Sequence, residues 1–372
     1  MRRTLFAVAA LGMFFTMVGR AGAVPAFARQ YHLSCSTCHV AYPKLKPFGE
    51  DFIANGYVLG GMQDRAYDDQ VIDDVLNLFK KPPIAMRFMH YFDTNIDFKN
   101  KTAFADFKTP WIVKLLTGGA IGENVSFYAY TIFEKGEAPF FEDAWVDIHN
   151  VLPFSIMIGQ FQISDFMFPR ELRLTRSDYY IYKLKATNLN ANLTYHRGIV
   201  FGISDLNVGV VNGNGIGPAE GGNYDTNNNK WFFGHYAIPV DFQLGLFALY
   251  GDDVDTLNNA LKLYRTGIDF AKNFGNSYLF AQIMYGFDND NTNAFYGGFI
   301  GLDYVKDDMN IISLLLNIIE APSGSAYYAK RMYTFSFTYS HYLYRNAKVI
   351  FETEYDFLNN RALLTLGADY AF

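Results

Sequence analysis

The sequence contains very little cysteine: Cys35 and Cys38 are the only two in 372 residues. Two thiols cannot supply the several disulfides of a small secreted domain, or the second cysteine pair of a closed zinc site. After residue 23 there is no apolar run of the roughly 20 residues that a membrane-spanning helix needs. A nucleophile with a neighbouring base, a phosphate-binding loop and paired carboxylates at a meaningful spacing are also missing. These absences argue against a helical membrane protein and against the common hydrolases and nucleotide-dependent enzymes.

The N-terminus has the organisation of a secretory signal peptide. Arg2 and Arg3 precede an apolar stretch, Leu5–Val18, which is too short to span a bilayer as a helix. Residues 21–23, Ala-Gly-Ala, form a small-residue cleavage site. We therefore expect residues 1–23 to be removed on export; a retained N-terminal anchor is the alternative. Loss of the three arginines of this segment changes the formal net charge from -6 to -9. Such an acidic surface disfavours nucleic acid as a partner.

Aromatic residues are abundant, with 36 Phe and 27 Tyr, and many of them alternate with polar residues. In "MYTFSFTYSHYL", Phe335 and Tyr339 share one face of an extended strand, and Ser336 and Thr338 share the other. Transmembrane β-barrels alternate in this way between lipid and lumen, and soluble β-sandwiches alternate between core and solvent. Periodicity alone does not separate the two classes. Export, the aromatic C-terminal residue Phe372 and the number of strands favour the barrel.

About sixteen such segments follow residue 84. The predicted strands lie near 85–96, 110–118, 124–133, 140–149, 155–164, 196–203, 206–212, 230–237, 241–250, 261–271, 276–286, 295–304, 309–319, 331–342, 347–355 and 362–372. Short connections such as "VKDD" alternate with long ones such as "GNGIGPAEGGNYDTNNN", as in barrels with short periplasmic turns and long outer loops. We predict an all-β fold, a transmembrane antiparallel barrel over residues 85–372 with both termini in the periplasm.

Two segments do not fit this regular pattern. Residues 165–195 read as a long loop, either outside or folded inward, although "DYYIYKLKA" could form another strand. Residues 24–84 lack alternation, include a predicted helix around Ala66–Lys80, and hold too few apolar residues for an independent domain. We expect residues 24–84 to plug the mouth of the barrel, where the wall would supply the missing core.

The plug segment contains both cysteines, in the sequence Cys35-Ser-Thr-Cys38-His39. C-x-x-C-H is the attachment motif of c-type haem, in which two thiols bind the vinyl groups and the histidine binds the iron. A disulfide is feasible after export but leaves His39 unexplained, and a zinc site would need further ligands. The motif therefore predicts one covalently attached haem c, with His39 as the proximal ligand of its iron.

The residues around this motif resemble a known family. "PAFARQ", four further residues, "CSTCH" and "YPKLKPFGEDFIANGY" are similar to the fused monohaem cytochrome c–porins of the bacterial outer membrane, whose best-known members are iron oxidases. The likeness is specific from Pro25 to about Gly60. Further on, "FFEDAWVDI", "GQFQISDFMFPREL" and "NVGVVNGNG" resemble segments of phosphate-selective porins. The resemblance implies a haem in or near the lumen that accepts electrons from an extracellular donor.

The motif does not specify the sixth ligand of the iron. We expect Met62, because a thioether raises the haem potential and so suits a weak donor such as Fe(II); Met86, Met89 and His90 are rivals. Arg29 and Gln30 are candidates for binding a haem propionate. Candidates for packing against the haem are the aromatic residues Phe27, Tyr31, Phe48, Phe52 and Tyr57.

These observations lead to a functional hypothesis with alternatives. The protein would be an electron-transfer protein of the bacterial outer membrane, with the activity of an iron:cytochrome c-type oxidoreductase. It would pass single electrons from extracellular Fe(II) or another donor to a periplasmic cytochrome c. A passive diffusion porin with a structural haem plug is one alternative, and electron transfer with a non-iron donor or acceptor is another.

Strand parity also makes a prediction for two acidic loops. If the C-terminus is periplasmic, the loops near residues 251–260 and 287–295 are extracellular. Their carboxylates would then face the medium and could gather a divalent cation, although turns favour Asp and Asn for conformational reasons alone. The residues concerned are Asp252, Asp253, Asp255, Asp288 and Asp290.

Overall fold

The computed structural model describes most of the chain outside the first residues and several loops. The described residues are 26–57, 59, 82–122, 124–134, 139–149, 151, 153–185, 192–216, 225, 227–254, 260–288, 293–323 and 330–372. The expected signal peptide, the expected helix around Ala66–Lys80 and Met62 lie outside these residues.

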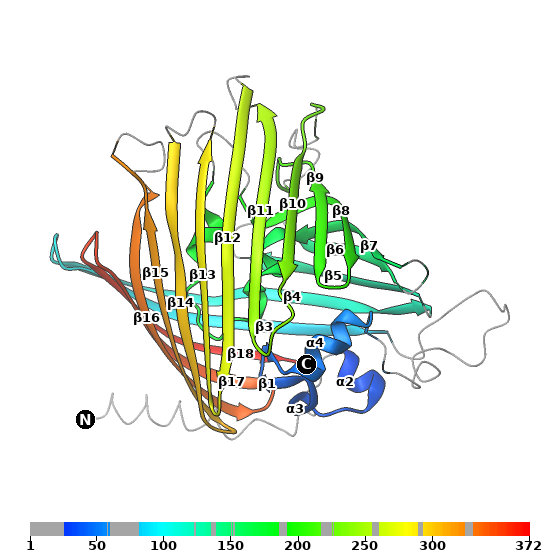
Figure 1. The fold of residues 1–372 in the computed structure, drawn as a ribbon. Helices are drawn as coiled ribbons and strands as arrows, with labels where there is room; N and C mark the ends of the chain where they lie inside the picture. The colour runs from blue at the N-terminus through cyan, green and yellow to red at the C-terminus, as the bar shows by residue number, and fades with distance from the viewer. Residues whose placement is uncertain are drawn as a thin grey trace.

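Sixteen strands form one closed antiparallel barrel (Figure 1). They are β3 (Ile84–Asp97), β4 (Thr102–Gly122), β5 (Val125–Glu134), β6 (Phe140–Ile148), β7 (Ser155–Gln162), β8 (Tyr195–Ile203), β9 (Leu206–Val211), β10 (Trp231–Ala237), β11 (Gln243–Val254), β12 (Ala260–Phe274), β13 (Ser277–Asp288), β14 (Asn293–Asp307), β15 (Asn310–Glu320), β16 (Met332–Tyr344), β17 (Ala347–Asp356) and β18 (Arg361–Ala371). The barrel closes where β18 pairs with β3, for example Ala371 with Arg87. The predicted all-β antiparallel barrel and its strand number are confirmed.

The direction in which side chains alternate distinguishes this barrel from a soluble sandwich. On β16, Phe335 on the outer face is 38% exposed, whereas Ser336 is fully buried. On β17, Phe351 is 45% exposed and its neighbour Glu352 only 2%. On these two strands polar side chains thus point inward and large apolar ones outward, the reverse of a soluble protein and the arrangement that lipid requires.

One strand is longer than the sequence indicates. We predicted a strand near residues 110–118, and proline, which cannot donate a hydrogen bond to a sheet, is unusual inside a strand. In the structure β4 begins at Thr102, and its pairing with β3 shifts register between Met89 and Tyr91, opposite the segment that contains Pro110. A local irregularity of this kind lets a strand continue through a proline.

The connections alternate in length as predicted. At the end where the C-terminus lies, strands are joined by short turns such as residues 275–276, 308–309 and 345–346. At the opposite end the connections include residues 163–194, 212–230 and 321–331. The even number of strands brings the last strand back to the end at which the first begins.

The described part of residues 163–194, which is residues 163–185 and 192–194, folds into the lumen and is named here the inner loop. It contains three 3-10 turns, η2 (Ile163–Phe166), η3 (Arg170–Leu172) and η4 (Tyr180–Lys183), so residues 178–185, the described part of "DYYIYKLKA", do not form a strand. Phe168, Tyr179 and Tyr182 pack on inward-facing aromatic residues of the wall, with the Tyr179 ring stacked at 4.2 Å on Phe299. The inner loop therefore completes an apolar core inside the barrel.

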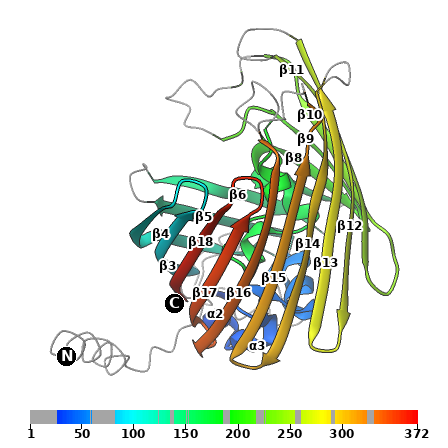
Figure 2. The same ribbon diagram turned by 90° about the vertical axis from the view of Figure 1, so that its left-hand side faces the viewer.

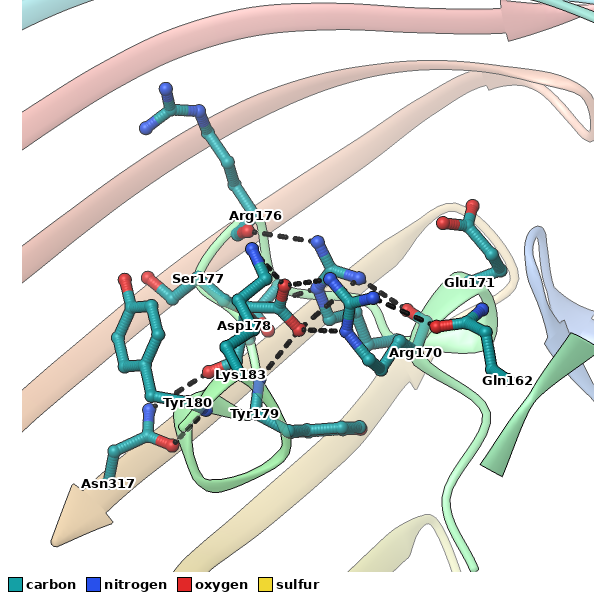
Figure 3. A network of polar contacts seen from close by, with 12 residues as sticks. Gln162, Arg170, Glu171, Arg176, Ser177, Asp178, Tyr179, Tyr180, Lys183 and Asn317 are labelled. Carbon is teal, nitrogen blue, oxygen red and sulfur yellow. Dashed lines mark hydrogen bonds and ion pairs between the residues drawn. The ribbon is translucent and has the colours of Figure 1, made fainter. Parts of the chain in front are cut away.

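A polar network holds the inner loop in this shape (Figure 3). Asp178 accepts hydrogen bonds from Arg170 and lies 2.7 Å from the Lys183 ammonium. The side-chain amide of Asn317 on β15 donates to the Asp178 carbonyl at 3.1 Å and accepts from the Tyr180 N–H at 3.2 Å. These bonds tie the loop to itself and to the wall.

The N-terminal segment, residues 26–57, lies at the end of the barrel where the C-terminus lies (Figures 1 and 2). It contains the helices α2 (Ala26–Tyr31), α3 (Cys35–Cys38) and α4 (Pro47–Ala54) and the short strands β1 (His39–Ala41) and β2 (Lys44–Leu45). No helix within the described residues is both long and apolar enough to cross a membrane.

This segment contacts the inner surface of the wall. Lys44 forms an ion pair with Asp303 of β14. The Tyr342 hydroxyl of β16 donates to the Tyr42 carbonyl at 2.6 Å. Asp303 and Tyr342 are both buried and face the lumen, so the described part of the predicted plug occupies the mouth of the barrel.

Candidate haem-binding site

The cysteine motif folds into a single helical turn, α3. The Ser34 side chain caps this turn by accepting a hydrogen bond from the Ser36 N–H at 3.3 Å. Residues three apart share one face of a helix, so Cys35 and Cys38 lie on the same side. Both thiols are free and half-buried, and burial raises the pKa of each above its ordinary value. At neutral pH the two sulfurs are therefore thiols and not thiolates.

His39 follows directly and is held at two points. Its backbone N–H donates to the Cys35 carbonyl, and its ring Nδ1 lies 2.9 Å from the carbonyl oxygen of Pro43. Because a carbonyl only accepts, Nδ1 carries the proton and Nε2 keeps its lone pair. Burial lowers the pKa of His39 and so favours the neutral ring. A neutral imidazole whose second nitrogen donates to a backbone carbonyl is the usual form of a metal-bound histidine.

All three residues line one cavity between the N-terminal segment and the barrel wall. Its volume is about 410 Å³, within the range of small-molecule and cofactor sites. The lining residues from the N-terminal segment include Phe27, Leu33, Cys35, Cys38, His39, Tyr42, Leu45, Phe52 and Tyr57. The lining residues from the wall and the inner loop include Arg87, Lys114, Leu116, Tyr128, Tyr130, Trp145, Met157, Gln162, Asp165 and Glu171.

One side of the cavity is aromatic. The rings of Phe27 and Tyr57 are stacked with centroids 4.6 Å apart, and Phe52 meets Phe27 edge-on at 5.4 Å. Tyr57 also lies at 6.1 Å, nearly parallel, from Tyr128 of β5 and from Trp145 of β6. This cluster binds the N-terminal segment to the wall and provides a flat apolar surface, as a porphyrin requires.

The opposite side is polar and contains two buried cations, Arg87 of β3 and Lys114 of β4. Arg87 pairs with Asp369 at 2.7 Å, and Lys114 pairs with Glu171 of the inner loop at 2.6 Å. Although burial opposes ionisation, Lys114 and Arg87 together lower the pKa of Glu171 to about 2. Glu171 is thus charged across the physiological range and links the inner loop to the wall.

Two further polar side chains line the cavity, and each has one atom without a hydrogen-bond partner in the described part of the chain. The Nε2 atom of Gln162 and the Oδ1 atom of Asp165 are buried and have no hydrogen-bond partner among the described residues. The Gln162 amide is oriented by its Oε1 atom, which accepts from Arg170 at 2.8 Å (Figure 3). Burial raises the pKa of Asp165 to about 7. Buried polar atoms of this kind usually have a partner.

These residues fit a haem c. Two thiols and an imidazole whose Nε2 is unprotonated are the donor set of the motif, and all three residues line the same cavity. The aromatic side suits the macrocycle. The Nε2 atom of Gln162 and the Oδ1 atom of Asp165, which have no partner among the described residues, suit the polar edge of such a ligand. A cluster of three or more His, Cys, Asp or Glu side chains able to hold a bare metal ion is not found within the described residues.

Several, but not all, of the predicted site residues that the structure describes line this cavity. Cys35, Cys38 and His39 are together, and Phe27, Phe52 and Tyr57 line the same cavity. Tyr31 lies behind the lining and donates to the Tyr57 carbonyl at 2.8 Å, whereas Phe48 is 42% exposed. The placement of Met62 is not described.

Two of the alternatives to Met62 as sixth ligand of the iron, Met86 and His90, are excluded by their position. The ring of His90 stacks on Phe88 and Tyr370 of the outer face, and Met86 lies between the inward-facing Ala85 and Arg87. Both predictions are wrong because strand parity turns these side chains away from the lumen. Arg29 donates to the Ile84 carbonyl at an exposed position and does not line the cavity.

The sequence did not identify Arg87, Lys114 and Met157 as cavity residues. Each of these residues stands in the sequence between apolar residues that face outward. The alternation therefore predicts that its own side chain points into the barrel. It does not indicate which part of the lumen the residue faces, because that depends on the register around the whole barrel.

The predicted exposure of the acidic loops is wrong for two residues. Asp253 is buried and accepts from the Trp231 indole at 3.1 Å. Asp288 is fully buried and pairs with Arg265 at 2.9 Å. Both lie within strands and point inward, since the strands extend further than the turn-like composition indicates. Asp255 and Asp290 lie outside the described residues.

Solved structures share this barrel. The anion-selective porin from Comamonas acidovorans is similar with a TM-score of 0.58 and 9% identity, over 78% of this chain and 98% of the porin. OmpF of Salmonella typhi in complex with daunomycin gives a TM-score of 0.57 at 9% identity, over 81% and 99%. The outer membrane channel DcaP of Acinetobacter baumannii gives 0.53 at 13% identity, over 78% and 97%.

The chain has the fold of an outer-membrane porin. At these identities the likeness extends to the fold alone. Comparison of the sequence with protein families and with curated proteins finds no match.

Proposed function

We propose that this protein is a monohaem cytochrome c–porin of the bacterial outer membrane that transfers single electrons from an extracellular donor to a periplasmic carrier. The observation that carries the proposal is the shared cavity of Cys35, Cys38 and His39, in which the bond of His39 Nδ1 to the Pro43 carbonyl leaves the lone pair on Nε2. The motif resemblance favours Fe(II) as donor and a soluble cytochrome c as carrier.

Each residue of the site has a stated task. The thiols of Cys35 and Cys38 would form the two thioether links, each sulfur adding across a vinyl group and its hydrogen passing to the neighbouring carbon. His39 would bind the iron through Nε2, with the Pro43 carbonyl fixing the ring. Haem c, when bound, supplies a centre that gains and loses one electron. The aromatic side formed by Phe27 and Tyr57 would keep water from its face.

The barrel contributes position and insulation. An outward apolar wall would place the site within the outer membrane, and the inner loop and N-terminal segment would obstruct the lumen around it. An electron could then cross a layer that a soluble carrier cannot enter. The short turns, the C-terminus and the N-terminal segment would lie on the periplasmic side.

Anaerobic mixing of the purified protein with Fe(II) tests the proposal. We expect rapid appearance of the absorption bands of a reduced c-type haem, followed by reoxidation when an oxidised soluble cytochrome c is added. The variant with Cys35→Ala and Cys38→Ala should fold as a barrel but carry no covalent haem. Covalent haem in that variant contradicts the attachment.

A passive diffusion porin is the second candidate, favoured by the structural likeness to porins. It predicts solute efflux from liposomes that contain the protein and no reduction by Fe(II). Reduction by another donor with no response to Fe(II) would instead retain electron transfer and replace the donor.

A further inference from the structure

A haem iron bound through His39 has a second axial position, on the face of the macrocycle away from the histidine. Methionine and histidine are the usual ligands there in cytochromes c. Apart from His39 itself, the only methionine or histidine among the described residues that lines the cavity is Met157 of β7. We infer that the thioether sulfur of Met157 is the second axial ligand, an inference that rests on the proposed haem site.

The register of the barrel fixes the direction of the Met157 side chain. Met157 pairs with Asp147 on β6 and with Val200 on β8, and directly opposed residues of antiparallel strands share a face. Val200 is 2% exposed, and Ile158, the next residue after Met157, is 48% exposed on the outer face. Met157 therefore points into the barrel.

Packing holds this side chain in the same region. Met157 is partly buried against the apolar core that includes Phe161, and Phe161 also lines the cavity. Thioether side chains are flexible enough to fill irregular apolar space and soft enough to bind iron. The position thus combines a suitable donor, an inward direction and access to the space that Cys35 and Cys38 share.

The other possible donors on the described part of the cavity wall are already engaged or chemically weaker. Lys114 is paired with Glu171 at 2.6 Å, so it would have to leave a buried carboxylate to bind iron. The hydroxyl of Tyr130 is hydrogen-bonded to that of Tyr195. Met89 points inward, opposite Asp369, but does not line the cavity.

The consequence is a coordination that joins the two parts of the chain. One axial ligand would come from the N-terminal segment and the other from the barrel wall, so that iron binding links the segment to β7. Binding energy contributed by a ligand set assembled only in the folded state stabilises that state. Coordination of the iron, in addition to side-chain packing, would then hold the N-terminal segment in the mouth of the barrel.

The test uses full-length protein with its covalent haem, in detergent, and the variants Met157→Leu and Met157→His. Leucine preserves volume and apolarity, and histidine replaces one axial donor with another. We expect Met157→Leu to lose the long-wavelength absorption band of methionine-bound ferric haem and to have a lower midpoint potential. Met157→His should also lose that band but retain the spectrum of a six-coordinate, low-spin iron.

The matched control is Met167→Leu. Met167 is a buried methionine of the inner loop that lines a different cavity, next to Phe168 and Gln243. Its replacement should leave the band and the potential unchanged. Met62→Leu is measured alongside, since that residue is the ligand predicted from the sequence.

The outcomes separate the inference from the proposed function. An unchanged band in Met157→Leu, or loss of the band in Met62→Leu alone, overturns the assignment of Met157 while the haem site stands. Absence of covalent haem from the unsubstituted protein, seen by denaturing gel and haem stain, overturns the proposed function and the inference with it. Loss of the band in Met157→Leu alone, with haem still attached, supports both.

Discussion

Gly49 lies directly against the carbonyl oxygen of Cys38: a Cβ built on this glycine would stand 2.5 Å from that oxygen. Helix α4 therefore packs on α3 through a contact that admits no side chain. The same carbonyl accepts the Lys46 N–H at 2.8 Å, so the cysteine turn and the start of α4 form one unit.

Gly49→Ala should loosen this unit. The added methyl group would separate α3 from α4, and overpacking of this kind typically costs about 1–3 kcal/mol. We expect faster hydrogen exchange over residues 26–57. The control is Gly234→Ala in β10, where the nearest atoms to an added Cβ are 3.7 Å away; equal exchange in both variants would contradict the close contact.

His39→Ala should separate the covalent attachment of haem from the coordination of its iron. The two thiols remain, so we expect covalent haem to persist, but the absorption spectrum should change because the iron loses its imidazole. Added imidazole should restore the original spectrum, since it replaces the missing Nε2 donor. A spectrum unaffected by the substitution would remove His39 from the site.

The Glu171–Lys114 link predicts a dependence of stability on pH. The pKa of Glu171 is lowered in the folded state to about 2, so its contribution is full above its ordinary value near 4.5 and is lost as the pH falls from there toward 2. Since 31% of the side chain is exposed, solvent screening limits the contribution to about 1–2 kcal/mol.

We expect Glu171→Gln to lower the free energy of unfolding by that amount at pH 7, and the difference to disappear near pH 2. Denaturant titration in detergent at several pH values measures it. Asp308→Asn is the control, because the Asp308–Arg345 pair is exposed, with 81% of the Asp308 side chain accessible. A difference between Glu171→Gln and the unsubstituted protein that is constant with pH would exclude the ionic link.

Asp178→Asn should release the inner loop. Arg170 and Lys183 would lose the carboxylate that both contact, and breaking a buried charge cluster costs about 3–5 kcal/mol. We expect larger single-channel conductance in planar bilayers as the loop leaves the lumen. Asp205→Asn, on an exposed turn, should conduct like the unsubstituted protein; unchanged conductance in both would mean that the loop does not obstruct the lumen.

Phe351→Lys tests the outer wall against lipid. A lysine on the lipid face near the middle of the bilayer costs roughly 2–4 kcal/mol in outer-membrane barrels. We expect poor assembly into liposomes, measured by protease protection. Phe357→Lys makes the same exchange in the turn after β17, where Phe357 is 56% exposed, and should assemble normally. Equal assembly would indicate that the outer face of β17 does not contact lipid.

The sequence by itself determined the number and approximate bounds of the strands, because alternation along a strand is a local property of neighbouring residues. Phe335 and Ser336 lie on opposite faces whatever the rest of the chain does. The sequence also determined that Cys35, Cys38 and His39 lie together, since the three residues fall within one helical turn and its cap.

Only the tertiary structure decided which face was the lumen and what surrounds the cysteine motif. Asp253 and Asp288 were expected outside because their composition is that of turns, but the pairing of β10 to β14 carries both residues inward. Met157 and Lys114 come to the motif from strands far along the chain. Their place in the lumen depends on the cumulative register of a closed barrel, which no local pattern encodes.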